Sequence, residues 1–296
     1  MTLSQGANAV NGVPDCRRHE GGAAMDDALQ YAGKHVVVSG GASGMGEATA
    51  RLLVDLGADV TVVDIKPTPV GGTRFAEVDL RDKTAIEQAV ATFGAADALF
   101  NCAGLPGPPY SDLDVMLVNF VGARDLIEQT ALKMPPGSAV AYIASGAGIG
   151  WQQQLETLMG LVTSDGFDAG KAWCEEHPEV FKLSAYMVSK QVINAWTAWR
   201  SFSLMRDRGI RLNCSNPGPT DTPMMPAFHA NSGKDLVDAA QGPIGRYSSP
   251  EEQAWPLVVL NSPRLSYVVG EALYVDGGFF GALQTGQIDF SRLMPK

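Results

Sequence analysis

Tyr186 and Lys190 are the two residues whose types and spacing best fit a chemical step, the transfer of a proton. They lie one helical turn apart in residues 184–190 (SAYMVSK), so their side chains share one face of a predicted helix. The Lys190 ammonium can stabilise the ionised Tyr186 phenol, whose pKa is ordinarily about 10. We therefore expect a lowered Tyr186 pKa. Pairs at this spacing also occur on ordinary solvated helix faces, so the interpretation depends on what surrounds them.

A glycine-rich segment, residues 39–46 (SGGASGMG), offers a place for a dinucleotide. It follows a valine-rich run at 34–39 that predicts a buried parallel strand, and it precedes an apolar-patterned helix at 47–56. Such glycines allow a tight turn and a close approach of pyrophosphate, while the start of the helix presents free amide groups to phosphates. The order strand, glycines, helix favours a dinucleotide site over a simple turn.

An acid, Asp64, ends the next predicted strand at 59–64. Its carboxylate can accept hydrogen bonds from both hydroxyls of an adenosine ribose, and it would repel a 2′-phosphate. Neither Ser43 nor Ile65 brings a compensating cation, although Lys66 is near. NAD is therefore predicted in preference to NADP. The alternative is that Asp64 is simply a strand-end carboxylate in solvent.

With these motifs in this order, the chain resembles the short-chain dehydrogenase/reductase family from about residue 32 to about residue 281. Residues 39–46 match the family's glycine motif, with serine where threonine is usual. Residues 101–104 (NCAG) match its Asn-Asn-Ala-Gly, with Cys102 replacing the second asparagine. The catalytic residues that the resemblance implies are Asn119, Ser145, Tyr186 and Lys190.

The resemblance also implies the contacts of the cofactor. Asp79 matches the acid that contacts the adenine ring, residues 216–222 match the segment that closes over the nicotinamide, and residues 274–278 resemble the last strand and its turn. The cofactor-binding residues expected from these matches are Ser39, Gly40, Ser43, Gly44, Met45, Gly46, Asp64, Asp79, Leu80, Asn101, Ala103, Gly104, Tyr186, Lys190, Pro217, Gly218, Thr220 and Thr222.

The mechanism implied by the family is an exchange of hydride and proton. Tyr186 exchanges the proton of an alcohol, and Lys190 lowers its pKa and holds the nicotinamide ribose. Ser145 orients the substrate oxygen and stabilises its developing charge, while Asn119 positions a water in the proton path. The cofactor carries the hydride.

The alternation of strand and helix predicts an α/β fold, and the resemblance implies a Rossmann-type doubly wound parallel sheet of about seven strands with helices on both faces. Ligands lie beyond the carboxyl ends of such strands, so Gly40, Asn101 and Ser145 should meet at one crevice. We expect a single catalytic domain at 32–296 after a disordered extension at 1–31. Met25 is a candidate natural start.

Residues 151–183 are predicted to be a helical insertion, because Ser145 and Tyr186 are 41 positions apart, more than is usual in the family. A first amphipathic helix is indicated by Trp151, Leu155, Leu158, Met159 and Val162. Residues 164–166 break it. Asp168 can cap a second helix, which carries Trp173 and ends before Pro178.

An insertion at this place is similar to those of bacterial coniferyl alcohol dehydrogenases and of the 3α-hydroxysteroid dehydrogenase/carbonyl reductase group. In such relatives the insert alters or blocks the helix-mediated dimer contact of the wider family. The resemblance therefore implies a homo-oligomer, a dimer or tetramer, whose interface is altered by this segment.

Composition limits the partners. The 296 residues, 45% of them hydrophobic, suffice for one large core, and a net charge of -10 with a pI near 4.8 argues against nucleic acid or anionic membrane. No apolar run approaches the length of a membrane span. Four cysteines and four histidines lack ligand spacing, so no metal site is predicted. A reducing, cytoplasmic setting fits.

The substrate is the least determined feature. An apolar pocket under a mobile lid at 222–231 favours a hydrophobic alcohol or ketone, either a steroid or an aryl-propenyl alcohol, and no residue decides between these. The same residues can equally be core or loop packing. The candidate lining residues are Trp151, Leu155, Met224, Met225 and Phe228.

Two other functions remain open at this stage. The chain could be a catalytically silent NAD(H)-binding protein of the same fold, although such relatives usually lack the tyrosine or the lysine. It could also be an epimerase or dehydratase of the extended branch. Those have a different glycine spacing and a larger C-terminal substrate region than the few residues after Gly278.

Overall fold

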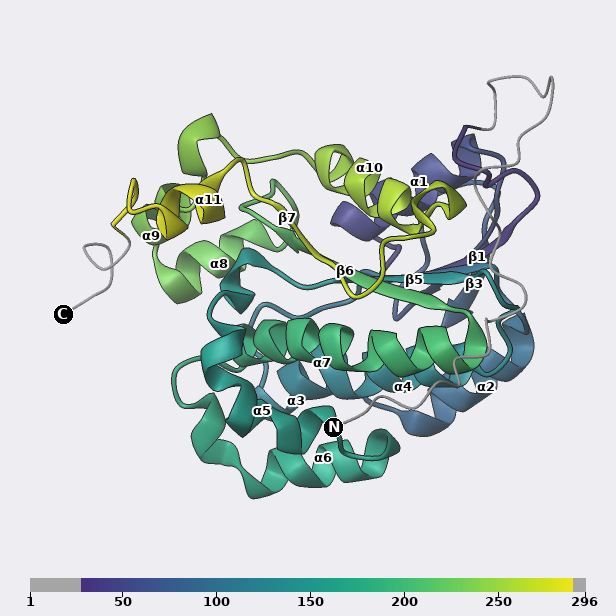
Figure 1. The fold of residues 1–296 in the computed structure, drawn as a ribbon, viewed down its shortest axis with the longest axis horizontal. Coiled ribbons are helices and arrows are strands. Elements are labelled where there is room, and N and C mark those ends of the chain that lie inside the picture. The colour runs from purple at the N-terminus through teal and green to yellow at the C-terminus, as the bar shows by residue number, and fades with distance from the viewer. Residues whose placement is uncertain (1–27, 290–296) are drawn as a thin grey trace, which may run out of the picture.

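Short runs of β-branched and apolar residues form seven parallel strands in one sheet (Figure 1). The computed structural model describes residues 28–289. The strand order is β3-β2-β1-β4-β5-β6-β7, which confirms the predicted doubly wound topology. The strands are β1 His35–Ser39, β2 Asp59–Asp64, β3 Arg74–Glu77, β4 Ala98–Asn101, β5 Ala139–Ile143, β6 Arg211–Pro217 and β7 Ala272–Val275.

The order of the strands reverses beside β1, at the place where sheets of this kind bind their ligands. After β3 the chain crosses back and places β4 on the other side of β1, with Ser39 in register with Asn101. In sheets of this kind the ligand lies beyond the carboxyl edge, between the segments that follow two such strands.

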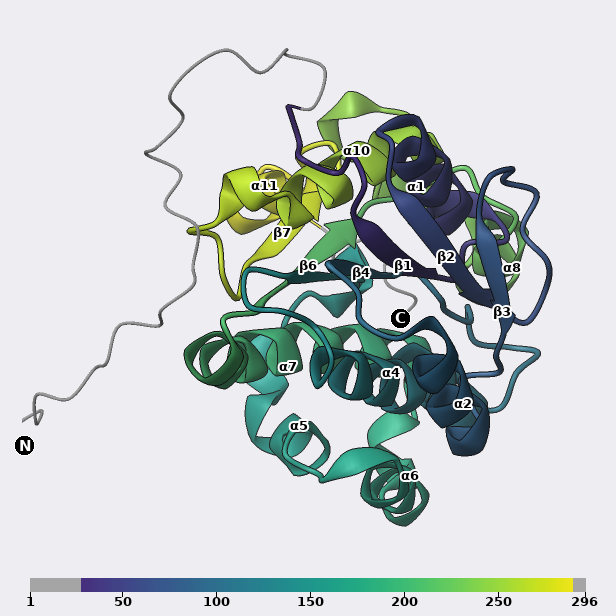
Figure 2. The same ribbon diagram turned by 90° about the vertical axis from the view of Figure 1, so that its right-hand side faces the viewer.

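Helices cover both faces of the sheet, as the side view in Figure 2 shows. On one face, α1 (Gly44–Asp55) packs against α10 (Pro250–Asn261). On the other face lie α2 (Lys83–Phe93), α4 (Gly122–Ala131) and α7 (Ala185–Arg208). Both faces of the central strands are buried, which explains the continuous apolar runs in the sequence.

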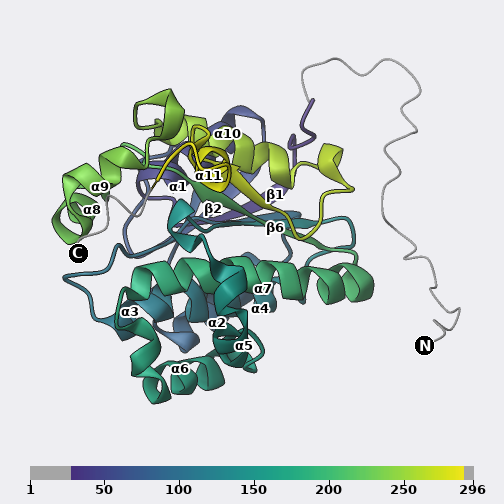
Figure 3. The ribbon, with the colours of Figure 1, turned by 60° about the vertical axis from the view of Figure 1, so that its left-hand side comes forward.

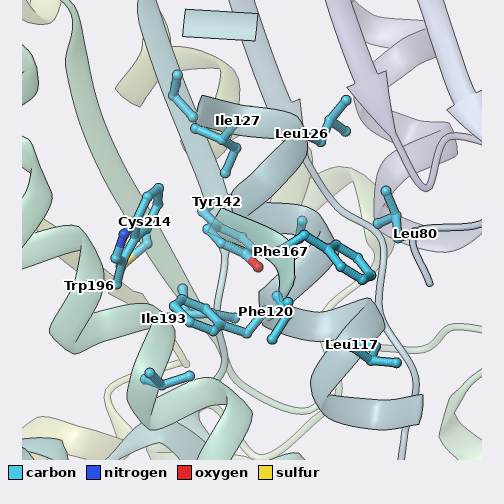
Figure 4. Packing of buried hydrophobic residues seen from close by; sticks show 14 of the residues in the cluster. Leu80, Leu117, Phe120, Leu126, Ile127, Tyr142, Phe167, Ile193, Trp196 and Cys214 are labelled. Carbon is cyan, nitrogen blue, oxygen red and sulfur yellow. The ribbon is translucent and has the colours of Figure 1, made fainter. Parts of the chain in front are cut away.

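Aromatic and aliphatic side chains pack together in the core between the sheet and α7 (Figure 4). Trp196 on α7 makes edge-to-face contacts with Phe120 and Tyr142, with ring centres 6.1 and 6.4 Å apart. Such contacts fix α7 against β5. Because Tyr186 and Lys190 lie on α7 and Ser145 follows β5, this packing sets the position of these three residues relative to one another.

The helix that contains Asn119 is interrupted. Ser111 caps α3 (Asp112–Met116) through the Asp114 amide, but a π-helical turn at Leu117–Val121 separates α3 from α4. A π turn widens the hydrogen-bond ladder locally. Hydrophobic periodicity alone did not reveal this turn.

The segment before β1 is packed rather than disordered from Ala28 onward. Tyr31 is buried, and its hydroxyl donates to the carbonyl of Val258 on α10. The Ser262 hydroxyl donates to the carbonyl of Leu29. The boundary predicted after residue 31 is therefore too late, while residues 1–27, including Met25, lie outside the described residues.

Between Trp151 and Phe181, two helices form an outer layer beyond α4 and α7 (Figure 2). The Arg124 guanidinium on α4 donates to the carbonyls of Leu161, Ser164 and Gly166, and so ties this layer to the domain. The elements are a 3-10 turn at Trp151–Gln154, α5 at Leu155–Val162, α6 at Gly166–Glu176 and a 3-10 turn at Pro178–Phe181.

The predicted cap of the second of these helices is wrong. Asp165 occupies the cap position of α6, and Asp168 lies within its first turn. The Asp168 carboxylate instead pairs with the Lys83 ammonium on α2 at 2.6 Å. The helix ends before Pro178, as expected.

The remaining elements lie around the carboxyl edge of the sheet or in its outer loops; Figure 3 shows α8, α9 and α11. They are α8 Met225–Ser232, α9 Lys234–Ala239, α11 Phe279–Gln284 and 3-10 turns at Gly146–Gly148, Gly242–Ile244 and Pro263–Leu265. Within residues 28–289, no helix is long and apolar enough to cross a membrane.

Candidate active site

The glycine loop after β1 is held by direct contact between backbone segments. Gly40 has a φ of +71°, and a Cβ there would lie 2.5 Å from the amide nitrogen of Ala103. A Cβ at Gly46 would lie 2.1 Å from the Gly40 carbonyl oxygen. Only glycine fits at both positions, because any side chain would displace backbone.

The loop also meets the segment that was predicted to cover the nicotinamide. A Cβ at Gly44 would lie 3.4 Å from the Cβ of Thr222, so residues 44 and 222 face each other. The side chain of Ser43 makes no bond to the start of α1. The first amide groups of α1, at Gly44, Met45 and Gly46, are in the position where helices bind phosphate.

Asn101 provides a test of whether a dinucleotide fits here. The Ser39 hydroxyl donates to its Oδ1 at 2.5 Å, and within residues 28–289 its buried Nδ2 has no hydrogen-bond partner. A buried donor without a partner is costly unless a ligand satisfies it. Together with the glycine turn and the amide groups of α1, it fits a nucleotide cofactor beside β1 and β4.

Asp64 lies at the edge of this loop. Its Oδ2 accepts from the amide of Ala42 at 3.0 Å and its Oδ1 from the amide of Lys66 at 3.1 Å. The carboxylate is thus oriented beside the glycine turn, where an adenosine ribose would lie. The Lys66 contact is made by the backbone amide, so it supplies no ammonium group to the carboxylate.

Asp79 has a partner that the sequence analysis missed. The Arg81 guanidinium donates two hydrogen bonds to the Asp79 carboxylate, from Nε at 3.0 Å and from Nη2 at 2.6 Å, and it also forms an ion pair with Asp114 at 3.1 Å. The hydrogen bonds from Arg81 lower the pKa of Asp79. The next residue, Leu80, has its carbonyl against Gly122, where an added Cβ would lie 1.8 Å away. An arginine two positions after the acid was the available signal.

Tyr186 and Lys190 lie close together on α7, as their spacing predicts. The Lys190 Nζ lies 5.5 Å from the centre of the Tyr186 ring and donates to the carbonyl of Ile143 on β5 at 3.1 Å. Gly104, after β4, lies alongside: a Cβ there would be 3.8 Å from the Lys190 Nζ and 3.4 Å from Asn119 Oδ1. Residues from β4, β5 and α7 thus converge.

The predicted lowering of the Tyr186 pKa is wrong for the protein alone. Burial raises the pKa of the Tyr186 phenol to about 12, and a hydrogen bond with Ser145 offsets only part of that rise. Burial also lowers the pKa of the Lys190 amine to about 8, so the amine is half charged near pH 8 and fully charged only well below it. Burying charged Lys190 costs stability below that pH, and the cost declines as the pH rises towards the ordinary lysine pKa.

Ser145 lies two residues after the end of β5 and is held by two bonds besides that to Tyr186. Its hydroxyl accepts from the amide of Ala147 at 3.1 Å, and its amide donates to Asn216 Oδ1 at 3.3 Å. The hydroxyl therefore faces the Tyr186 phenol from a fixed turn. This is the arrangement that a donor to a shared substrate oxygen requires.

The Asn119 side chain joins three segments. Its Oδ1 accepts from the Leu105 amide at 2.6 Å, and its Nδ2 donates to the Leu105 carbonyl and the Ser189 hydroxyl, both at 3.0 Å. Ser189 in turn donates to the Tyr186 carbonyl at 2.6 Å. The Asn119 carbonyl accepts from the Tyr142 hydroxyl. Sequence reasoning missed Ser189 and Tyr142.

The segment after β6 is anchored at several points. The Gly218 amide donates to the Val275 carbonyl at 3.0 Å, and the Thr220 hydroxyl bonds Gly218 and Ser248. These bonds lead the chain from Pro217 to Thr222, beside Gly44. The predicted nicotinamide segment and the glycine loop are thus brought together.

The five candidate pocket residues belong to different elements: the 3-10 turn at Trp151–Gln154, α5, and the start and body of α8. Phe228 on α8 packs edge-to-face on the Tyr186 ring, with centres 5.0 Å apart. Met225 is buried, and Met224 is half-buried at the start of α8. Trp151 packs against the main core, whereas Leu155 is 38% exposed. Only Phe228 has a described contact with a catalytic candidate, and the pocket stays a prediction.

Family models and known relatives match most of the chain. The model described as enoyl-(acyl carrier protein) reductase matches residues 176–280, and that of the NAD dependent epimerase/dehydratase family matches residues 36–200. Coniferyl-alcohol dehydrogenase of Pseudomonas sp. strain HR199 is 29% identical over 251 residues, which cover 84% of this chain and 98% of that protein.

Two hydroxysteroid dehydrogenases are also similar. The 3-alpha-hydroxysteroid dehydrogenase/carbonyl reductase of Comamonas testosteroni is 32% identical over 265 residues, covering 85% of this chain and 98% of that protein. The crystal structure of the 3-alpha-hydroxysteroid dehydrogenase from Pseudomonas sp. B-0831, complexed with NADH, superposes with a TM-score of 0.73 at 27% identity. It covers 86% of this chain and 100% of that one. The chain belongs to the short-chain dehydrogenase/reductase family.

Proposed function

We propose that this protein is an NAD-dependent oxidoreductase that interconverts a hydrophobic alcohol with its ketone or aldehyde. The observation that carries the proposal is the convergence of Ser145, Tyr186 and Lys190 beside a glycine turn that fits a dinucleotide. The similar dehydrogenases named for coniferyl alcohol and 3-alpha-hydroxysteroids support the substrate class. They also disfavour the silent-binder alternative.

In the proposed mechanism Tyr186 moves the proton at the substrate oxygen. Its pKa of about 12 means that the phenol carries its proton at neutral pH, the form that can donate to a carbonyl. Oxidation of an alcohol needs the phenolate and should therefore accelerate as the pH rises. When bound, the nicotinamide supplies or accepts the hydride.

Ser145 and Lys190 act on either side of that proton transfer. The Ser145 hydroxyl, hydrogen-bonded to Tyr186, is placed to hold the substrate oxygen and stabilise negative charge on it. Lys190, while charged, favours the phenolate from 5.5 Å and is near enough to the crevice to hold a ribose hydroxyl. Asn119 links the turn after β4 to α7, and its role in placing a water remains part of the proposal.

Preference for NAD over NADP is proposed to come from Asp64. Replacing Asp64 with Ser should lower the ratio of kcat/KM for NAD over NADP by about tenfold, an effect of about 1.4 kcal/mol, because the repulsion of a 2′-phosphate is lost. Asp59→Ser is a matched control at the other end of β2, where the carboxylate pairs with Arg74 at 2.7 Å. An unchanged ratio in Asp64→Ser would refute the assignment of Asp64.

The test of the activity itself is a substrate panel. We expect a change in NADH absorbance with coniferyl alcohol, a 3α-hydroxysteroid or cyclohexanol as probes, and a rate of oxidation that rises with pH while that of reduction does not. NADH binding without turnover of any alcohol or of the matching carbonyls would favour the silent binder. Conversion of a substrate without net change in NADH would favour an epimerase.

A further inference from the structure

Two buried asparagines, Asn194 on α7 and Asn216 on β6, form a reciprocal amide pair behind the active site. Asn194 Nδ2 donates to Asn216 Oδ1 and Asn216 Nδ2 donates to Asn194 Oδ1, both at 3.1 Å. The Cys214 thiol also donates to Asn194 Oδ1 at 3.2 Å. Asn194 is 1% exposed and Asn216 is 0% exposed, so the pair is shielded from water.

This pair joins three segments that each carry part of the proposed chemistry. The Ser145 amide donates to Asn216 Oδ1 at 3.3 Å, the oxygen that also accepts from Asn194. Asn194 lies one helical turn after Lys190, and two turns after Tyr186. Asn216 is the first residue of the segment 216–222, which is predicted to close over the nicotinamide, and it is followed by Pro217. One amide pair thus connects the serine turn, the tyrosine helix and the cofactor segment.

The surrounding backbone leaves the serine turn little freedom to shift. A Cβ at Gly148, in the turn after Ser145, would lie 2.5 Å from Asn194 Nδ2 and 2.8 Å from the Lys190 carbonyl oxygen. The turn therefore rests directly on α7 at the level of Asn194. A change at position 194 would act on the turn first.

The burial of two amide side chains indicates that their hydrogen bonds fix the relative position of the segments that they join. Buried polar groups cost free energy unless they are fully paired, and an apolar pair could fill the same space. We propose that Asn194 is a positioning residue that, through Asn216, fixes Ser145 relative to Tyr186; this rests on the proposed function.

The experiment compares Asn194→Ala with Asn261→Ala. Asn261 is equally buried, at 2% exposure, and its Nδ2 donates to the carbonyls of Leu99 and Ala139 at 3.1 and 3.2 Å, outside the active site. Both variants should lose stability. Only Asn194→Ala should lose kcat, by about tenfold to a hundredfold with the best alcohol of the panel, because a small misplacement of Ser145 is that costly. The KM for NADH should stay within about twofold.

A second readout does not depend on turnover. Hydrogen exchange of the peptide that contains the Ser145 amide should be faster in Asn194→Ala, because Asn216 Oδ1 is no longer held, and unchanged in Asn261→Ala. Asn194→Ser retains a donor, folds more readily and should recover part of both effects.

Equal kcat per folded molecule in Asn194→Ala and Asn261→Ala, or unchanged exchange at Ser145, would overturn the proposal. If the wild-type protein turns over no alcohol of the panel, the proposed function fails, and the exchange measurement still decides whether Asn194 holds Ser145.

Discussion

The two sides of the crevice are built differently. On the cofactor side, backbone packs on backbone, so that added Cβ atoms at Gly40 and Gly46 would lie 2.5 and 2.1 Å from backbone atoms. The other side, where the substrate is predicted to lie and which we call the substrate side, contains α8. Side chains hold this helix in place: His229 bonds the Tyr247 hydroxyl at 2.9 Å, and Asn231 donates to the Pro108 carbonyl at 3.1 Å.

This difference bears on which side can change without disturbing the fold. Direct backbone contact tolerates no added atom, whereas a surface helix held by side chains tolerates substitution at exposed positions. Of the α8 residues, Met225 is buried, while the rest are half-buried or exposed. We infer that the cofactor side determines whether the protein binds a nucleotide and that α8 tunes which alcohol it accepts.

The largest effect is expected where the two sides meet, at Tyr186. Replacing Tyr186 with Phe removes the hydroxyl that moves the proton, so kcat should fall about a thousandfold while the dissociation constant for NADH changes little. Steady-state kinetics measure kcat, and a titration followed by NADH fluorescence measures the dissociation constant. Tyr267→Phe, at a fully exposed ring, is the control. Retention of a tenth or more of the activity would reject Tyr186 as the acid and base.

A smaller effect, confined to the cofactor side, is expected for Gly40→Ala. The new methyl group would overlap the backbone of Ala103 in a left-handed conformation, costing about 1–3 kcal/mol and widening the phosphate turn. NADH affinity should fall more than about tenfold, as measured by calorimetry. Gly71→Ala is the matched control, because nothing lies within 4 Å of a Cβ there. Normal NADH affinity in Gly40→Ala would show that the turn can relax.

The cofactor side was also the more predictable from sequence. Strands such as β2, predicted at 59–64, are local runs of β-branched residues. The spacing of the glycines in the loop is itself the signal that another group must approach its backbone closely. The i, i+4 spacing of Tyr186 and Lys190 fixed their common face. The strand endings then placed Ser145 correctly.

What the sequence left out depends on contacts between distant segments. Three such contacts join residues that are far apart in the chain. They are the ion pair between Arg81 and Asp114, the ion pair between Lys83 and Asp168, and the contact of buried Tyr31 with α10. The pKa of Tyr186 is raised rather than lowered because desolvation, which depends on the whole fold, outweighs the hydrogen bond with Ser145. The lining of the substrate site and the oligomeric state stay predictions.

The smallest effect is expected on the substrate side, at Phe228. Replacing it with Ala removes an edge-to-face contact with Tyr186, worth about 0.5–1.5 kcal/mol beyond area burial, and removes an apolar side chain beside Tyr186. The KM for a bulky alcohol should rise a fewfold, whereas NADH affinity and the rate with cyclohexanol should change less. Phe202→Ala, an exposed ring on the outer part of α7, is the control. If Phe228→Ala instead weakened NADH binding as strongly as Gly40→Ala, α8 would belong to the cofactor side, and the division between the two sides would fail.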